Sequence, residues 1–298
     1  MLTPLLRISK DIKLSHSVFA MPFALLGAFL ATSQRAAPGA SKWPHWGELA
    51  LVISSMVCAR TWAMCVNRFA DADIDAQNPR TAGRAVPSGA VSRAMMGTVA
   101  MLSAGGFIAS CAGFLLWGNF WPTALALPVL ALLGAYSYAK RFTWACHLLL
   151  GITLAISPCA AAIALEPHTL QTPTPWLLAG MIWCWVSGFD ILYALQDVES
   201  DREQGVFSIP ANLGEKPALW ISRLLHLGAA GFLTTLVLAD HHLGAGFALA
   251  TAATIGLLAL EHILVALDAR KNLPMAFFTV NGVISLLLGA AGIWDLLR

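Results

Sequence analysis

Charged residues are scarce in this chain: Asp, Glu, Lys and Arg together make up 11% of its 298 residues. Soluble globular domains carry about a quarter charged residues, so this composition excludes an ordinary soluble domain. The formal net charge is only +2 at pH 7 and no basic run stands apart from the rest. We therefore expect no nucleic-acid partner, and no feature of the sequence points to a protein partner.

Cysteine patterns that would indicate disulfides or zinc are also missing. The six cysteines have no CxxC spacing, and all of them lie in apolar stretches. We expect them to be small buried hydrophobic residues. A cleavable signal peptide is not expected either, because the first apolar run is too long and no small-residue cleavage site follows it.

Long apolar runs are abundant, since 58% of the residues are hydrophobic and the mean hydropathy is +0.70. A helix of about 17 to 25 apolar residues crosses the hydrocarbon layer of a membrane, which is about 30 Å thick. Nine such runs are expected, over residues 14–32, 46–66, 91–113, 119–137, 144–165, 175–195, 217–239, 243–265 and 275–295. The sequence thus predicts an all-α integral membrane protein, with residues 1–298 forming one domain.

The positive charges indicate how the chain is oriented. Most of the eighteen Lys and Arg residues fall before the first run or between runs two and three, four and five, six and seven, or eight and nine. Short loops rich in Lys and Arg stay in the cytoplasm. We therefore expect a cytoplasmic N-terminus, an inner-membrane type of location in bacteria, and cytoplasmic loops that carry the functional site.

Two acidic clusters end the second and the sixth apolar runs. The first contains Asn67, Asp71 and Asp75, spaced four residues apart, and the second contains Asp190, Asp197 and Asp201. On continuous helices each set would share one face. Like charges so close together repel unless a cation neutralises them, and Mg²⁺ takes carboxylate and amide oxygens while it holds a substrate phosphate. For either cluster taken alone, the alternative to a metal site is a helix end in water, with nearby arginines that balance the charge of the carboxylates.

Arg60 lies seven residues before Asn67, on the same expected face and roughly 10 Å deeper in the membrane. An arginine at the centre of a membrane helix costs at least about 2.5 kcal/mol, so it should face a polar cavity or a partner. The sequence allows a structural pair with Glu48. The functional interpretation is a clamp for a carboxylate or phosphate of a substrate.

Further cations and tyrosines gather beside the loops on the expected cytoplasmic side. They are Arg80 and Arg84, Tyr138 with Lys140 and Arg141, and Tyr193. They are candidates for binding an anionic head group, although loop cations and interfacial tyrosines also mark the membrane boundary alone.

The recurrence of the acidic clusters indicates an internal duplication, with two halves of four helices each and one extra helix. Both clusters lead into a polar loop that contains arginine, proline and glycine. A secondary transporter would also place Asp residues in membrane helices, but near the middle of the membrane rather than at one end. A non-catalytic scaffold would not need two clusters of side chains that can bind a metal.

These stretches resemble the UbiA superfamily of intramembrane aromatic prenyltransferases, and within it the 4-hydroxybenzoate polyprenyltransferase group. The likeness is carried by SHSVFAMPFALLGA, ARTWAMCVNRFADADIDAQNPRTAGRAVPSGAVS, YSYAKRFT and GFDILYALQDVESDREQGVFSIPANLG. The resemblance implies helices around a central cavity, and two Mg²⁺ ions held by the two Asp motifs. It departs at Arg68, where many relatives carry Asp.

Residue roles follow from the resemblance alone. It assigns Asn67, Asp71, Asp75, Asp197 and Asp201 to Mg²⁺ and diphosphate, with Asp71 and Asp197 central to catalysis. It implies that Asp190 orients a phenol or accepts a proton and that Arg60 holds an aromatic carboxylate. The diphosphate would be surrounded by cations, and the substrate-binding set comprises Arg68, Arg80, Arg84, Tyr138, Lys140, Arg141 and Tyr193.

The implied substrates are a polyprenyl diphosphate and an aromatic acid. The acceptor favoured by the resemblance is 4-hydroxybenzoate, as in ubiquinone biosynthesis, and a dihydroxynaphthoate for menaquinone is the alternative. The length of the prenyl chain is not readable from the sequence.

Overall fold

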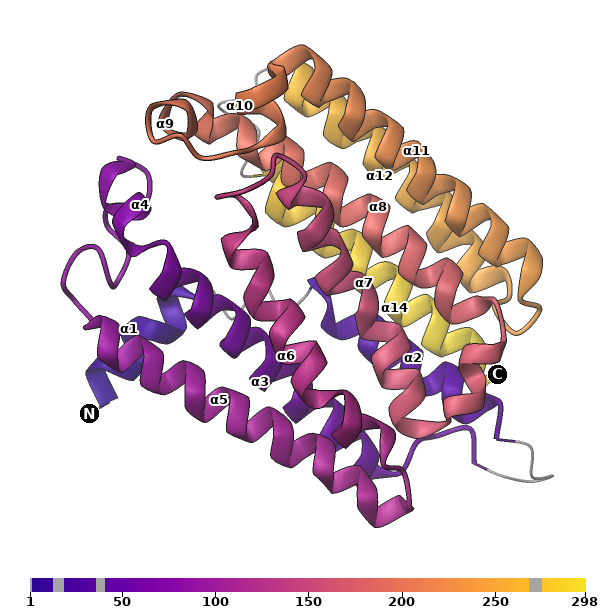
Figure 1. The fold of residues 1–298 in the computed structure, drawn as a ribbon. Coiled ribbons are helices and arrows are strands. Elements are labelled where there is room, and N and C mark those ends of the chain that lie inside the picture. The colour runs from indigo at the N-terminus through magenta and orange to yellow at the C-terminus, as the bar shows by residue number, and fades with distance from the viewer. Residues whose placement is uncertain (1, 13–18, 36–40, 268–274) are drawn as a thin grey trace.

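The computed structural model describes residues 2–12, 19–35, 41–267 and 275–298, and these residues form helices and loops without any strand. Long helices run side by side through the molecule as one bundle (Figure 1). The prediction of an all-α membrane protein is confirmed. Eight helices are long and apolar enough to cross a membrane, and a shorter apolar helix adds a ninth candidate.

The helix bounds follow the apolar runs closely. The long helices are α2 Met21–Ser33, α3 Trp46–Ala70, α5 Arg93–Gly113, α6 Trp121–Ala139, α7 Cys146–Leu165, α8 Thr174–Ala194, α11 Glu215–Ala239, α12 Ala245–Leu267 and α14 Asn281–Leu297. The π-helical turn η5 Met275–Val280 leads into α14. The expected start of the first run, near residue 14, lies outside the described residues. The fourth run forms a helix although Pro128 lies inside it.

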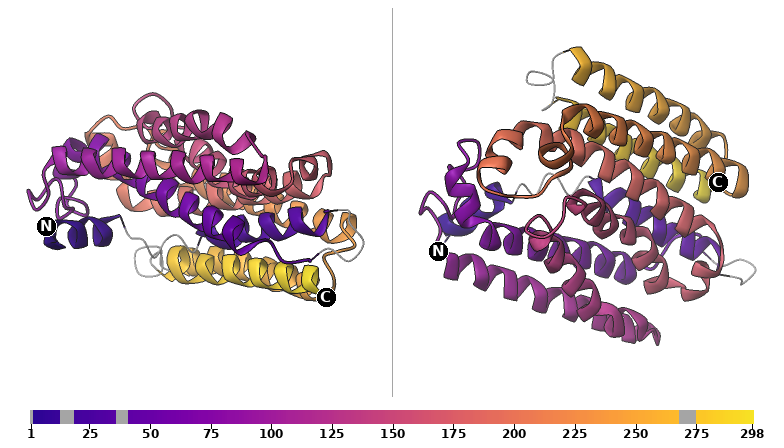
Figure 2. Two further views of the ribbon diagram at one scale, coloured as in Figure 1. Left: turned by 90° about the horizontal axis from the view of Figure 1, so that it is seen from below. Right: turned by 45° about the horizontal axis from the view of Figure 1, so that its top comes forward.

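The expected two halves have matching contacts. In the first half, α3 is the second long helix and packs on the third, α5; in the second half, α8 is the second long helix and packs on the third, α11. Contacts of α2 and α7 hold the halves together, and α14 lies against α2 and α12 as the extra helix (Figure 2).

The contact between α2 and α7 depends on a glycine. A methyl group added at Gly27 would collide with the backbone of Pro158, so only glycine permits this separation of the two helices. Cores are packed as densely as organic crystals and tolerate added volume poorly. Gly27 therefore fixes how closely the two halves approach each other.

Short helices gather at one end of the bundle. They are α1 Leu2–Asp11, α4 Ala72–Gln77, α9 Val198–Glu203 and α10 Ile209–Leu213. Figure 1 shows α4 and α9 near the same end of the molecule, with the N-terminus at that end and the C-terminus at the opposite one. We call this the motif end, because both acidic clusters adjoin these short helices.

The expectation that each acidic cluster lies on one continuous helix is wrong. Helix α3 ends at Ala70, and Asp71 is both its C-cap and the residue before α4. In the second cluster, α8 ends at Ala194, and a 3₁₀ turn through Asp197 precedes α9. A carboxylate is unfavourable at a helix C-terminus and favourable at an N-terminus, so a new helix starting at each Asp suits its charge.

The six cysteines lie in the long helices and form no disulfide: Cys58 and Cys65 in α3, Cys111 in α5, Cys146 and Cys159 in α7, and Cys184 in α8. The expectation of burial is correct for Cys65, Cys111 and Cys184, whereas Cys58, Cys146 and Cys159 are only partly buried.

Candidate active site

Asp71 is the most enclosed carboxylate of the first cluster, with 1% of its side chain exposed. Lys140 places Nζ 2.7 Å from Oδ2, Arg141 places Nη2 3.2 Å from Oδ1, and Asn67 donates from Nδ2 to Oδ2 at 2.9 Å. Both cations follow the end of α6, so these contacts join α6 to the end of α3. Asp71 Oδ1 is nevertheless buried without a hydrogen bond in the described residues.

Asp75 lies one turn further on and is also buried. Arg84 donates from Nη1 to both of its carboxylate oxygens at 2.7 Å. The loop after the first cluster therefore folds back over it, and its arginine neutralises the second carboxylate of the cluster.

The two clusters meet through Asp197. Asn78 donates from Nδ2 to Oδ1 of Asp197 at 2.8 Å, and Arg80 donates from Nε to the same oxygen at 2.9 Å. Asn78 and Arg80 belong to the loop that follows the first cluster, whereas Asp197 belongs to the second. The structure thus brings the loop after the first cluster against the second cluster, although more than a hundred residues separate them in the sequence.

Arg80 also contacts Tyr193, since Nη1 donates to the phenol oxygen at 3.0 Å and the guanidinium lies 5.2 Å from the ring centroid. Burial alone would lower the pKa of Arg80, but the hydrogen bond to Asp197 and the contacts with Tyr193 raise it above its ordinary value. Arg80 therefore stays a cation between the two clusters.

Asp201 accepts a hydrogen bond from the hydroxyl of Ser208 at 2.8 Å. The neighbouring backbone N–H of Phe207 donates to the carbonyl of Lys140 at 2.8 Å. Because Lys140 is itself the partner of Asp71, these contacts connect the loop after α9 to the first cluster.

Asp190 lies in α8 and has a partner that the sequence analysis did not single out. His147, near the start of α7, places Nδ1 2.6 Å from Oδ2 of Asp190. No motif marked this histidine. Its only signal in the sequence was its place shortly after the expected head-group cations Lys140 and Arg141.

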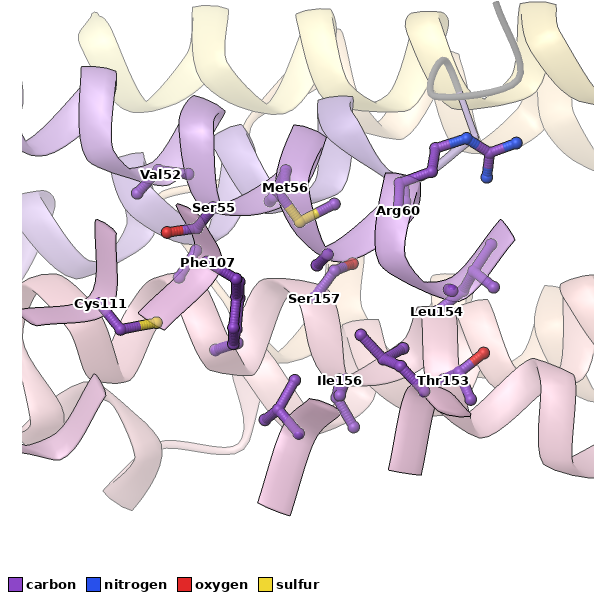
Figure 3. A pocket seen from close by; sticks show the side chains of 18 of the residues that line it. Val52, Ser55, Met56, Arg60, Phe107, Cys111, Thr153, Leu154, Ile156 and Ser157 are labelled. Carbon is purple, nitrogen blue, oxygen red and sulfur yellow. The ribbon is translucent and has the colours of Figure 1, made fainter. Parts of the chain in front are cut away.

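Arg60 lines an apolar cavity of about 200 Å³ formed by α2, α3, α5, α6 and α7. In Figure 3, Arg60 lies towards one side of the view and Cys111 and Val52 towards the other, with Met56 and Ser157 between them. Glu48, the alternative partner, instead pairs with Arg35 and caps α3. The Nε atom of Arg60 is buried and has no hydrogen bond in the described part of the chain.

Arg68 is buried beside the first cluster and pairs with the N-terminal helix. It is 5% exposed, its Nε lies 3.4 Å from Oδ2 of Asp11 in α1, and its Nη1 donates to Oδ1 of Asn67 at 2.7 Å. In this geometry Arg68 hydrogen-bonds the first cluster through Asn67, and it anchors the N-terminal helix beside the cluster.

Two more residues complete the motif end. The ring of Tyr138 lies 5.3 Å from the guanidinium carbon of Arg141, and Tyr138 is 41% exposed. Asp73 pairs with Arg93 and leaves 78% of its side chain in solvent. Asp73, which breaks the four-residue spacing of the cluster, is thus exposed where Asp71 and Asp75 are buried.

The donor atoms at the motif end suit Mg²⁺. The ion binds oxygen ligands, needs only one or two carboxylates, and keeps several waters. Asp71 offers a buried oxygen without a hydrogen bond, and the carboxylates of Asp75, Asp197 and Asp201 lie at the same end of the bundle. Among the described residues no three Asp, Glu, His or Cys side chains converge on one point.

Comparison with known proteins agrees with the fold and the motifs. A model of the UbiA prenyltransferase family matches residues 20–283. A 4-hydroxybenzoate octaprenyltransferase of Paracidovorax citrulli is 34% identical over 59% of this chain and 57% of its own length. The apo structure of a UbiA homologue from Aeropyrum pernix superposes with a TM-score of 0.83 at 31% identity, covering 95% of this chain and 98% of the other.

A more distant solved structure has the same fold. It is a UbiA homologue from Archaeoglobus fulgidus bound to GPP and Mg²⁺, with a TM-score of 0.72 at 15% identity, covering 97% of this chain and 99% of the other.

Proposed function

The chain belongs to the UbiA prenyltransferase family, and from this premise we propose that it transfers a polyprenyl group from an allylic diphosphate to the ring of an aromatic acid, with 4-hydroxybenzoate as the acceptor. The observation that carries the proposal is the junction of the two clusters, where Asn78 and Arg80 both bind Asp197.

The diphosphate binds at the motif end, between the clusters. Lys140, Arg141, Arg80 and Arg84 now neutralise Asp71, Asp197 and Asp75. The same four cations are suited to phosphate oxygens, and arginine binds phosphate through paired N–H groups. On substrate binding these side chains turn to the diphosphate, which frees the carboxylate oxygens.

Asp71, Asp75, Asp197 and Asp201 are then the residues that hold Mg²⁺, with Asn67 beside Asp71. When bound, Mg²⁺ supplies positive charge that stabilises the departing diphosphate. In this geometry Oδ1 of Asn67 accepts from Arg68 and Nδ2 donates to Asp71, so Asn67 orients the carboxylate of Asp71 and would offer its own oxygen to a metal only after Arg68 moves.

The prenyl chain occupies the apolar cavity below the clusters. Its lining is almost entirely aliphatic and aromatic, with Arg60 among the few polar groups. An apolar chamber excludes water, so the allylic cation that forms when the C1–O bond breaks is protected from hydrolysis. The electron pair of that bond leaves with the diphosphate.

The acceptor ring lies between Arg60 and Asp190. Arg60 binds the carboxylate of the aromatic acid, and its buried Nε without a hydrogen bond is available for that contact. Asp190 binds the phenol hydroxyl. The ring carbon next to the hydroxyl then donates its electrons to C1 of the prenyl group. The proton on that carbon passes to the carboxylate of Asp190, and the electrons of the C–H bond restore the aromatic ring.

The location follows from the same arrangement. Because the Lys and Arg residues of the loops gather at the motif end, this end faces the cytoplasm, where soluble aromatic acids are available. The helices themselves make the chain an integral membrane protein.

The proposal is tested by incubating membranes that contain the protein with radiolabelled geranyl diphosphate, Mg²⁺ and one acceptor at a time. Prenylated 4-hydroxybenzoate is the expected product. If product forms only with a dihydroxynaphthoate, the protein is still a prenyltransferase, but its acceptor is not 4-hydroxybenzoate. No product from any aromatic acid, while membranes containing a known prenyltransferase are active, would refute the proposal.

A further inference from the structure

His147 and Asp190 form a close pair beside the site. The two residues come from neighbouring helices, α7 and α8, and only 2.6 Å separates Nδ1 of His147 from Oδ2 of Asp190. A carboxylate accepts hydrogen bonds, so Nδ1 is the donor in this contact. The side chain of His147 is 6% exposed and that of Asp190 is 22% exposed.

The two carboxylate oxygens of Asp190 differ in their contacts. Oδ2 is bound to His147. Oδ1 has no hydrogen bond to a described residue and is not fully buried. It therefore remains accessible to a ligand. The contact with His147 restrains the carboxylate group and therefore also Oδ1.

His147 lies on the face of α7 that lines the cavity further along the helix. Leu150 and Leu154 of α7 line the cavity, and they lie three and seven residues after His147, on the same face of the helix. His147 therefore occupies the turn of that face nearest the motif end.

We propose that His147 is a positioning residue, which holds Asp190 so that Oδ1 receives the hydroxyl hydrogen bond of the aromatic acceptor. This inference rests on the proposed function and deepens it. His147 does not touch the substrate itself and acts only through the carboxylate. A hydrogen bond to a charged group contributes about 1.5–3 kcal/mol, which corresponds to roughly 10- to 100-fold in affinity.

Three variants separate this role from a structural one. His147→Asn keeps an N–H donor near the position of Nδ1, because the amide of Asn branches at the corresponding atom. His147→Gln moves the donor to the position of Nε2, and His147→Ala removes it. We expect the KM for 4-hydroxybenzoate to rise about 10-fold or more in the Gln and Ala variants. The Asn variant should stay within about 3-fold of wild type.

The prenyl donor, geranyl diphosphate, serves as the internal control. The KM for geranyl diphosphate should stay the same in all three variants, because His147 does not contact the diphosphate in this account. As a second measurement, inhibition by 4-methoxybenzoate, which has no hydroxyl proton to donate, should be the same in wild type and His147→Ala.

Failure of this inference differs from failure of the proposed function. If wild type prenylates 4-hydroxybenzoate but the Gln and Asn variants behave alike, or both substrates lose affinity equally, His147 does not position Asp190. If wild type forms no product with any aromatic acid, the proposed function itself fails. Monodisperse elution and an unchanged melting temperature establish that each variant is folded.

Discussion

Arg80 donates a hydrogen bond from Nε to Oδ1 of Asp197 at 2.9 Å, and this contact joins the loop after the first acidic cluster to the second cluster. The two residues come from different halves of the molecule. A diphosphate bound at this junction would be held by both halves at once.

Asp71→Asn and Asp197→Asn should each reduce prenyl transfer by at least about 100-fold, because a neutral amide binds Mg²⁺ weakly and leaves the surrounding cations without their partner. The rate is measured with radiolabelled geranyl diphosphate at saturating acceptor. Asp73→Asn is the matched control, since Asp73 belongs to the same sequence cluster but is exposed. Full activity in either test variant would count against the site.

Arg60→Ala should raise the KM for the aromatic acid by about 10- to 100-fold while the KM for the prenyl diphosphate changes little. The reason is that the guanidinium lines the cavity apart from the cations around the Asp clusters. Arg93→Ala, an exposed pair partner of Asp73, provides the comparison. An equal rise in both KM values would overturn the assignment of Arg60 to the acceptor.

Ser55→Phe should shorten the prenyl chain that the enzyme accepts. Ser55 lines the cavity on the side away from Arg60, so an aromatic ring there fills space needed by a long chain (Figure 3). Transfer from geranyl diphosphate should persist while transfer from longer diphosphates falls. Val57→Phe introduces the same ring on an exposed part of α3 that does not line the cavity. Equal loss with short and long donors would contradict a tail in this cavity.

Gly27→Ala should lower the melting temperature in detergent, because the added methyl group collides with the backbone of Pro158; overpacking of this kind costs about 1–3 kcal/mol. Gly105→Ala in α5 meets no atom within 4 Å and should be neutral or stabilising. Intrinsic tryptophan fluorescence during heating measures both. Equal melting temperatures for Gly27→Ala and wild type would show that the two helices separate without cost.

The long helices could be predicted from the sequence because each apolar run must satisfy its own backbone hydrogen bonds in lipid, and a helix does this locally. The expected run 46–66 begins where α3 begins, and Pro128 lies inside α6 without ending it. Such local rules need no knowledge of the neighbouring helices.

The contacts of the site could not be predicted in the same way. The helix breaks at Asp71 and Asp197 depend on how the clusters fold against each other, and an apolar pattern does not report them. The same is true of His147, whose partner lies 43 residues away, and of Arg68, which turns to Asp11 in α1. Periodicity places a residue on one helix but does not identify its partner on another.

The central claim is that the two clusters bind a diphosphate together with Mg²⁺, and removal of the metal tests it most directly. Purified protein is incubated with radiolabelled geranyl diphosphate and 4-hydroxybenzoate, first with Mg²⁺, then with excess EDTA, and then with Mg²⁺ restored. We expect product in the first and third reactions and none in the second. Undiminished product in the presence of EDTA would contradict the account.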